Sequence, residues 1–493
     1  MLFNSYVFIL LFLPITWGIY FILNSYSYYK AAQICLITAS LIFYGFYNWK
    51  YMFVIMGSIV VNYLIAILGH FFRNRMFNIF LSRGGIRLDR LIILLGIIGN
   101  IGVLFYFKYM NFFLENVSSL FHINFNILKI VLPLGISFYT FQQISFLIDT
   151  YKENIIYKFE DYAEFVCFFP QLVAGPIVSH SIIAQFKDTE RKKVNFDYLS
   201  RGLFLFSVGL FKKIIIADTF AKAADWGFSN VGVMSSMDAI IVMISYTFQI
   251  YFDFSGYSDM AVGLAAMFNI DIPCNFNAPY QADSIIDFWK KWHITLTQFL
   301  RKYIYYPLGG SKKGNKRTYF NIFIVFLLSG IWHGANWTFI VWGMIHGIAN
   351  ICNRIFDGIW RKVWGWLRWG CTFSFLCITW MIFRAESLKQ VGDFLQRIFS
   401  GFTIQVTHEL AECFVLPEVD LLTYVLNIHG YSFISSIIML LAILIAFGIV
   451  IKVKPFAQQS FQPQISNLLG TMVCLIWSIF SLADNSIFIY FGF

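Results

Sequence analysis

The chain has 493 residues, of which 59% are apolar and 20% aromatic. Only 13% are charged, about half the fraction usual in soluble domains. This composition excludes an ordinary soluble protein and indicates an integral membrane protein. Uncharged apolar runs recur along nearly the whole sequence, and several reach the ~20 residues that a helix needs to cross a membrane. We therefore predict an all-α polytopic protein with about ten or eleven helices, some of them interfacial or re-entrant, in a single membrane domain over residues 1–493.

The basic residues lie mostly in short segments between the apolar runs. Residues 73–90 hold five Arg against Asp89, and residues 287–317 hold eight Lys or Arg against Asp287. This is the positive-inside pattern, which accounts for the net charge of +10 without nucleic acid as a partner. The first apolar run lacks the basic start and the cleavage site of a signal peptide, so it is expected to be a retained helix. We predict that both basic segments face the cytoplasm and that the N-terminus lies on the exterior side.

Two apolar stretches are interrupted by proline and glycine. FFPQLVAGPI at residues 168–177 is one of them, and residues 131–149, with Pro133 and Gly135, are the other. Irregular backbone is tolerated at membrane depth only where it is buried in protein or lines a cavity. We therefore predict re-entrant or funnel-shaping segments at both places.

The stretch YFDFSGYSDMAVGLAAMF, residues 251–268, places Asp253 and Asp259 in apolar surroundings. The favoured interpretation is turn chemistry, with a break at Gly256 and a following helix capped by Ser258 or Asp259. In the alternative, Asp253 orients a histidine or binds a hydroxyl-bearing substrate. Nothing in the spacing selects this second interpretation.

Residues 287–310, DFWKKWHITLTQFLRKYIYYPLGG, predict a basic amphipathic helix. At 100° per residue, the aromatic and aliphatic side chains form one face and the Lys and Arg side chains form the other. Such a helix should lie in the cytoplasmic interface and end at Pro307 and the glycines that follow it. His293 falls at the border of the two faces, where it either points towards a cavity or packs beside the neighbouring tryptophans.

Residues 318–353 contain no Asp, Glu, Lys or Arg, yet they include His333 and His346. An ionisable group inside a membrane must find a partner or line a cavity, so His333 is a functional candidate, with helix packing as the alternative. Gly330 and Gly334 flank it and leave room for a substrate or another backbone. His346 lies about 20 Å further along a straight helix and on another face. We therefore predict a structural role for His346.

The sequence offers few other signals of chemistry. Its eight cysteines form no CxxC pair and are expected to be small buried apolar residues. It contains no GxSxG, P-loop, HExxH or acidic metal cluster, and no GxGxxG motif after a strand. We therefore expect neither a metal site nor a bound cofactor, and any catalysis should depend on histidine.

Residues 287–310 and LLSGIWHGANWTFIVWGMIHG at 327–347 together resemble the membrane-bound O-acyltransferase family, specifically its bacterial branch that acetylates alginate, peptidoglycan and similar envelope polysaccharides. The likeness covers nearly the whole chain. It extends to FFPQLVAGPI (168–177), FLFSVGLFKKIIIADTF (204–220), YFDFSGYSDMA (251–261), WMIFRAESL (380–388) and the closing IFIYFGF (487–493).

The resemblance implies a helical ring around a thin central region, with a funnel on each side. It makes His333 the family's catalytic histidine and His293 a second polar residue of the site. We expect His333 to act as general base and His293 to orient the thioester or stabilise the oxyanion, with an acyl-histidine intermediate as the alternative. The further candidates for substrate contact are Asp253, Trp332, Ser329 and Gln143.

The resemblance also implies reaction partners and a location. Acetyl-CoA or a carrier-bound acetyl thioester would be the donor, used from the cytoplasmic side of a bacterial inner membrane. A separate SGNH-type protein on the exterior or periplasmic side would complete transfer to a polysaccharide, either peptidoglycan or an alginate-like polymer. Three alternatives stay open: transfer of D-alanine to teichoic acid or of another acyl cargo, proton-coupled transport, and a membrane scaffold that recruits a partner.

Overall fold

The computed structural model of the chain describes residues 1–46, 48–74, 87–123, 125, 128, 130–399, 401, 403–426, 432–459, 461–482 and 488. The regular elements within these residues are helices, and no strand is found among them. Six helical stretches are long and apolar enough to cross a membrane, namely Val7–Ser25, Trp49–Arg73, Leu88–Phe121, Ser236–Met267, Gly365–Arg384 and Phe433–Gln458. The predicted all-α polytopic class is confirmed, whereas the number of membrane crossings stays a prediction.

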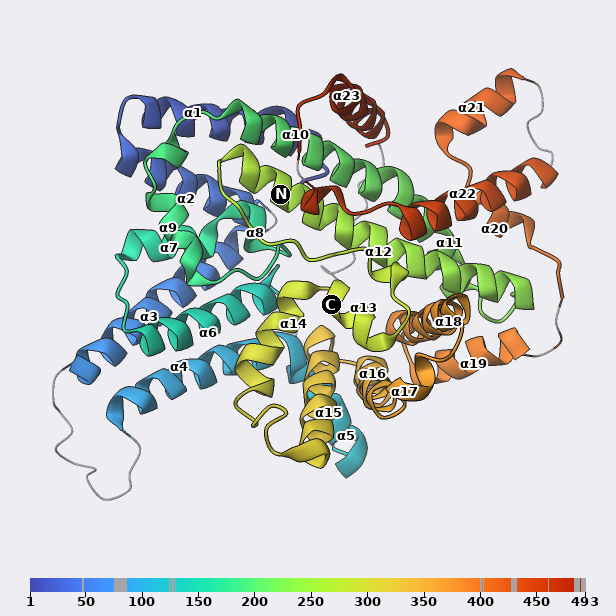
Figure 1. Ribbon diagram of the computed structural model, residues 1–493, viewed down its shortest axis with the longest axis horizontal. Coiled ribbons are helices and arrows are strands. Elements are labelled where there is room, and N and C mark those ends of the chain that lie inside the picture. The colour runs from blue at the N-terminus through green and yellow to red at the C-terminus, as the bar shows by residue number, and fades with distance from the viewer. Residues whose placement is uncertain are drawn as a thin grey trace. The chain divides into compact units, whose positions relative to one another are not determined.

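The described chain packs as two compact units (Figure 1). The first unit comprises Met1–Phe206, Ser258–Pro273 and Gln462–Thr471, and the second comprises Ser207–Tyr257, Cys274–Phe461 and Met472–Phe493. Helices α10 (Phe196–Phe211), α12 (Ser236–Met267) and α23 (Ile465–Phe480) each contribute residues to both units. Because the segments alternate along the chain, neither unit is a simple sequence domain.

The first unit is built mainly from the N-terminal helices. They are η1 (Val7–Phe12), α1 (Leu13–Ser25), α2 (Tyr29–Gly45), α3 (Trp49–Asn74), α4 (Leu88–Leu104), η2 (Phe105–Tyr109), α5 (Met110–Phe121), α6 (Ile136–Glu153), α7 (Phe159–Cys167), α8 (Phe169–Leu172), η3 (His180–Ile182), α9 (Ile183–Lys187) and η4 (Glu190–Lys192). Helix α1 packs on α2, and α4 packs on both α3 and α6.

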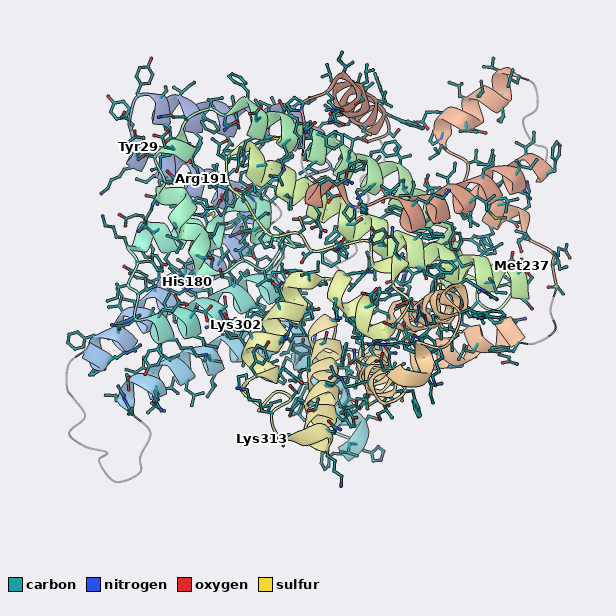
Figure 2. The ribbon with its side chains drawn as sticks, in the orientation of Figure 1. Tyr29, His180, Arg191, Met237, Lys302 and Lys313 are labelled. Atoms are coloured by element: carbon teal, nitrogen blue, oxygen red, sulfur yellow. The ribbon has the colours of Figure 1, made fainter. Side chains whose placement is uncertain are left out.

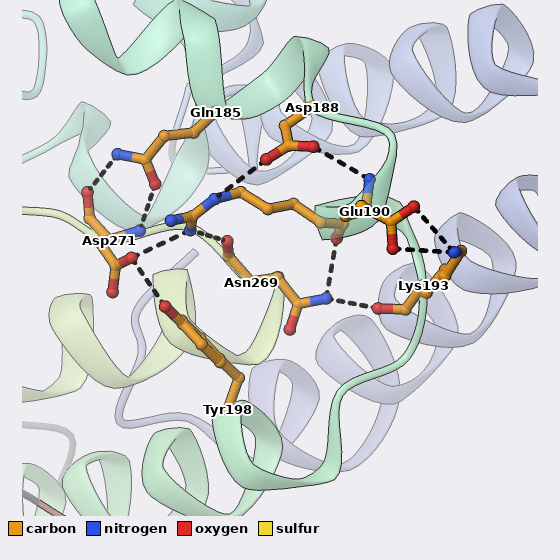
Figure 3. Close-up of polar contacts among 8 residues, drawn as sticks. Gln185, Asp188, Glu190, Lys193, Tyr198, Asn269 and Asp271 are labelled. Carbon is orange, nitrogen blue, oxygen red and sulfur yellow. Dashed lines mark hydrogen bonds and ion pairs between the residues drawn. The ribbon is translucent and has the colours of Figure 1, made fainter.

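A polar cluster fixes the connection between α9 and α10 to the end of α12 within this unit (Figure 3). The Arg191 guanidinium lies 3.0 Å from the Asp271 carboxylate and donates to the carbonyl oxygen of Asn269 at 2.6 Å. Tyr198 donates to the same carboxylate, and Gln185 exchanges hydrogen bonds with the backbone of Asp271. The polar connection between α9 and α10 is therefore an ordered part of the fold.

The two proline- and glycine-interrupted stretches meet in the first unit. Gly135 has φ +70° and precedes α6, and a Cβ placed on it would lie 2.8 Å from the carbonyl oxygen of Val173. Residues 168–176 are buried around the short helix α8. The prediction of irregular backbone buried in protein is confirmed, while its part in a funnel stays a prediction.

The second unit contains the segments singled out for chemistry. Its elements are η5 (Lys212–Ala217), α11 (Asp218–Ser229), η6 (Pro279–Gln281), α13 (Ile285–Lys291), α14 (Ile294–Leu300), η7 (Arg301–Tyr305), α15 (Gly314–His333), α16 (Trp337–Ile355), α17 (Asp357–Trp360), α18 (Gly365–Arg384), α19 (Leu388–Phe399), α20 (His408–Glu412), α21 (Pro417–Val425), α22 (Ser432–Lys452) and η8 (Phe456–Gln458). The long uncharged run 318–353 forms parts of two helices, α15 and α16. Lys302 and Lys313, which belong to the second basic segment, are exposed (Figure 2).

Helix α12 contradicts the turn predicted inside residues 251–268. It continues without a break from Ser236 to Met267, so Ser258 and Asp259 cap nothing. Gly256 instead allows close helix packing, because a Cβ there would lie 2.7 Å from the carbonyl oxygen of Gly209 on α10. Small residues at such contacts are common between membrane helices.

Two other sequence features need comment. Most of the basic segment 73–90 and most of the closing IFIYFGF lie outside the described residues. The prediction that the cysteines are buried is wrong for most of them: Cys167 and Cys377 are buried, whereas Cys352 and Cys371 are exposed.

Candidate active site

The predicted single helix over residues 287–310 is broken at His293. Helix α13 ends at Lys291, Trp292 is extended, and His293 has φ +42° and ψ +56° before α14 begins. The left-handed region is unfavourable for a residue with a Cβ, and such strain gathers at functional sites. The apolar face is as predicted, since Phe288, Trp289, Trp292, Leu296, Phe299 and Leu300 are all buried.

Asn275 holds the backbone on the far side of this break, and sequence reasoning did not identify it. Its backbone oxygen accepts from the amide of Ile294 at 2.9 Å. Its side-chain oxygen accepts from the hydroxyl of Thr295 at 2.6 Å and from the Thr295 amide at 3.3 Å. Asn275 is itself fully buried, so these bonds fix the strained position of His293. The only sequence signal was an asparagine in the stretch CNFNAPY, residues 274–280, a few residues before α13.

The imidazole of His293 is fully buried. Its ring centroid lies 4.8 Å from that of Phe254, which meets it edge to face, and 6.2 Å from that of Trp332. Burial lowers the pKa of His293 to about 3, because the charged form is desolvated. The ring is therefore neutral at neutral pH, with one nitrogen that can donate and one that can accept.

His333 is the last residue of α15 and is 3% exposed. Its ring is surrounded by aromatic side chains, with centroid distances of 5.0 Å to Trp332, 5.2 Å to Trp342 and 5.2 Å to Phe383. These neighbours come from α15, α16 and α18, so three helices fix the ring position. The prediction of a buried histidine in a water-poor setting is confirmed.

The glycines beside His333 allow another helix to pack closely. The sequence had left open whether they make room for a substrate or for another backbone. A Cβ on Gly330 would lie 2.4 Å from the carbonyl oxygen of Phe339 and 3.1 Å from Cα of Gly343 on α16. A Cβ on Gly334 would overlap the Phe339 ring. The space that these glycines leave is therefore occupied by α16.

Trp332 connects the two candidate catalytic residues, because both histidine rings contact it. Trp342 adds a second indole beside His333. Trp342 is fully buried, and its indole N–H has no hydrogen-bond acceptor among the described residues. A buried donor without a partner is costly and requires an explanation. Nothing in the WTFIVW run, residues 337–342, distinguishes Trp342 as a site residue in the sequence.

His346 is closer to this cluster than a straight helix would allow. The chain turns between α15 and α16, and Trp342 contacts His333 at 5.2 Å and His346 at 4.8 Å. The expected separation of about 20 Å is therefore wrong, since it assumed one unbroken helix. The predicted structural role nevertheless agrees with the contacts: Trp289 donates to Nδ1 of His346, and Nε2 pairs with Thr379.

The other candidates for substrate contact belong to different helices. Asp253 is buried and lies 2.6 Å from the ammonium of Lys213, which also contacts Asp218 at 2.9 Å. Ser329 lies one turn before His333 on α15 and is buried. Gln143 belongs to the first unit, where its side-chain oxygen accepts hydrogen bonds from Ser58 and Asn62.

The geometry therefore supports a reaction of histidine in dry surroundings. A neutral His293, a second buried histidine and an indole N–H without an acceptor are suited to moving a proton and stabilising a developing oxyanion. Acyl transfer needs both of these functions. No group of three or more His, Cys, Asp or Glu able to hold a metal ion occurs in the described part of the chain.

Comparison with known proteins agrees with this chemistry. The model of the membrane-bound O-acyltransferase family matches residues 152–388. The chain is 38% identical over its whole length to the peptidoglycan O-acetyltransferase of Helicobacter pylori, covering 98% of that protein. It is 36% identical to the probable alginate O-acetylase AlgI of Pseudomonas aeruginosa, over 83% of this chain and 76% of that protein. The teichoic acid D-alanyltransferase of Bacillus subtilis is 29% identical over 51% of this chain and 69% of its own length.

The chain is thus an O-acyltransferase with membrane-spanning helices. It belongs to the membrane-bound O-acyltransferase family, and the full-length match places it with relatives that O-acetylate polysaccharides.

Proposed function

We propose that this protein passes an acetyl group from a cytoplasmic thioester across the inner membrane for O-acetylation of an envelope polysaccharide. Peptidoglycan is the first candidate, because the relative matched over the full chain bears that name. An alginate-like polymer is the second candidate. The structural observation that supports the reaction most directly is the contact of both His293 and His333 with Trp332.

In the proposed step, His333 takes the proton of an acceptor hydroxyl. The hydroxyl oxygen then attacks the thioester carbonyl, and the carbon–sulfur bond breaks as the tetrahedral intermediate collapses. The thiolate leaves and takes up the proton from His333, which returns the ring to its neutral state. A positioned base of this kind contributes typically ~10² to 10⁴-fold to the rate.

The oxyanion of that intermediate needs donors, and two are proposed. His293, held by Asn275 at the helix break, is one of them. The indole N–H of Trp342 is the other, since it is buried beside His333 and has no acceptor in the described chain. Removing one such donor costs about 10² to 10³ in turnover in enzymes with a preformed oxyanion site.

The partners in the proposal follow the polysaccharide branch of the family. Acetyl-CoA or a carrier-bound acetyl thioester is the donor on the cytoplasmic side. An SGNH-type protein outside the membrane accepts or completes the transfer. The N-terminus is proposed to lie on that exterior side, from the positive-inside distribution.

D-alanyl transfer to teichoic acid is the second candidate function, favoured by the partial match to a teichoic acid D-alanyltransferase. Purified protein in nanodiscs, incubated with labelled acetyl-CoA or with a carrier protein charged with acetyl or D-alanyl groups, separates the cargoes. Label transfer from the acetyl donors supports the main proposal. Transfer from the D-alanyl carrier alone contradicts it.

The cellular test is mass analysis of peptidoglycan and secreted polysaccharide from cells that carry His333→Ala. Acetyl esters should fall to the level of the deletion strain, while the variant inserts and folds normally. His70→Ala is the matched control, because His70 is also buried but lies in the first unit. A His333→Ala strain with normal acetylation would contradict the assignment, and so would a proton flux in liposomes that needs no acyl donor.

A further inference from the structure

A groove in the second unit is lined by residues from α13, α16, α17 and α18. Figure 1 labels these four helices. The volume of the groove is about 340 Å³, within the range of small-ligand sites. The walls are mainly apolar and include Ile285, Ala349, Phe356 and Phe375, and Cys352, Cys371, Asn353, Trp360 and Thr372 complete them. None of the residues assigned to acyl transfer lines this groove.

Two buried donors on α18 have no hydrogen-bond partner at this place. The hydroxyl of Thr372, which lines the groove and is 3% exposed, has none among the described residues. Neither has Nε of Arg368, although Nη2 of the same guanidinium lies 2.8 Å from Asp283. Arg368 does not itself line the groove, but it lies one turn before Thr372 on the same face of α18. Together they offer hydrogen bonds to an acceptor-rich ligand.

Basic and aromatic residues stand close along the chain to residues that line the groove. Arg354 follows the lining residue Asn353, and Lys362 lies two residues after the lining residue Trp360. Both side chains are exposed, and neither has an ion-pair partner in the described chain. Trp364, four residues after Trp360 along the chain, is also exposed. Tryptophan and basic residues together mark the membrane–water interface, where phosphate headgroups lie.

We propose that this groove binds an anionic glycerophospholipid. One acyl chain fills the apolar cavity, and ester and phosphate oxygens accept hydrogen bonds from Thr372 and Arg368. The headgroup lies beside Arg354 and Lys362. A free phosphate or other small anion would leave the apolar walls uncovered, so a lipid fits the combined chemistry better. This inference is independent of the acyl group that the enzyme transfers.

The first unit offers a matched comparison. A groove of about 480 Å³ between η1, α1 and α2 is lined by apolar residues together with Thr16, Cys35 and Thr38. Neither threonine has a buried hydroxyl without a partner, and no Lys or Arg lies within two residues of the lining residues along the chain. It should accept any acyl chain without preference for the headgroup.

The test uses the full chain in nanodiscs with phosphatidylglycerol or phosphatidylcholine that carries the same diazirine acyl chain. After irradiation, crosslinks are quantified by mass spectrometry on the peptides of the two grooves. We expect phosphatidylglycerol to label the α16–α18 groove about fivefold more than phosphatidylcholine does, because Arg354 and Lys362 attract its net negative charge, whereas the ester and phosphate oxygens are common to both lipids. The η1–α2 groove should label equally with both lipids.

Variants assign the preference to residues. Thr372→Val keeps the side-chain shape and should reduce phosphatidylglycerol labelling about fivefold, as the loss of one hydrogen bond predicts. Arg354→Gln with Lys362→Gln, both at exposed positions, should remove the headgroup preference. Thr38→Val is the control and should change nothing. Equal labelling by the two lipids, full labelling in the variants, or displacement of the lipid by inorganic phosphate would each overturn the proposal.

Discussion

The indole nitrogen of Trp289 lies 3.2 Å from Nδ1 of His346, and Nε2 of the same ring lies 3.1 Å from the hydroxyl of Thr379. An indole nitrogen only donates, so Nδ1 accepts and the ring proton is on Nε2. Nε2 then donates to Thr379, which donates to the carbonyl oxygen of Leu376. The imidazole of His346 is therefore a neutral link in a buried hydrogen-bond chain and has no nitrogen to spare for a substrate.

Trp289→Phe should consequently lower mainly the stability of the protein, and Trp342→Phe mainly its turnover. Trp289→Phe leaves Nδ1 of His346 without its donor, which should cost about 1–3 kcal/mol of stability beyond the lost ring volume. Trp342→Phe removes an N–H that has no acceptor, so its stability cost should be smaller, while turnover should fall about 10² to 10³-fold. Thermal unfolding in detergent and acetyl transfer per folded molecule measure the two effects. Equal activity in both variants would exclude Trp342 as an oxyanion donor.

The membrane class and His333 could be predicted because they depend on local composition. An uncharged run of 36 residues, 318–353, can only lie in apolar surroundings, and a histidine within it is conspicuous. The apolar face of residues 287–310 was likewise visible, because helical periodicity survives a short break. These features need no knowledge of the tertiary structure.

The breaks and partners could not be predicted, because tertiary contacts create them. His293 adopts a left-handed conformation only where Asn275 holds the next residues, and nothing in WHIT itself indicates this. Gly256 fits closely against Gly209 inside a continuous helix, whereas the local sequence favoured a turn at this glycine. The pairing of Asp253 with Lys213 joins residues forty positions apart, which a single sequence does not reveal.

Gly343→Ala should destabilise the contact between α15 and α16. The added methyl would lie 2.5 Å from the carbonyl oxygen of Phe326, and backbone cannot move aside cheaply. Overpacking of this kind costs typically ~1–3 kcal/mol. Gly370→Ala on α18 is the control, since it meets nothing within 4 Å and should stabilise by about 0.5–1 kcal/mol through helix propensity. Thermal unfolding of both variants checks the sign, and two equal shifts would contradict the packing argument.

Lys213→Met should be more damaging than Asp253→Asn. Lys213 is buried and pairs with both Asp253 and Asp218, so its substitution removes the cation that these two carboxylates share, at a cost of about 3–5 kcal/mol. In Asp253→Asn, Lys213 keeps its ion pair with Asp218, so the loss of stability should be smaller. We expect folded Asp253→Asn protein to keep acetyl transfer. A stable Asp253→Asn enzyme without activity would instead restore Asp253 as a substrate contact.

Asn275→Ala should uncouple activity from stability. The substitution removes the side-chain oxygen that accepts hydrogen bonds from Thr295 at the start of α14, which should cost about 1 kcal/mol of stability. It also releases the strained backbone of His293. Ser284→Ala removes the equivalent bond to the amide of Asp287 at the start of α13 and should cost a similar amount. Acetyl transfer by folded protein should fall at least tenfold more in Asn275→Ala than in Ser284→Ala. Displacing a catalytic group by ~1 Å costs about 10² in rate. Matching activities would show that the break is only structural.

The buried His293 should make the protein less stable in acid. Its pKa is about 3 in the folded chain against 6.5 when unfolded, so between these values the unfolded chain binds a proton that the folded chain does not. This contribution to stability is complete above pH 6.5 and is lost as the pH falls, by about 1.4 kcal/mol per pH unit. His293→Gln removes this proton uptake, so its melting temperature should fall less between pH 7 and pH 5 than that of the wild type. His122→Gln serves as control, because His122 is exposed at the end of α5. An identical acid sensitivity in His293→Gln and wild type would show that the ring is not held neutral by burial.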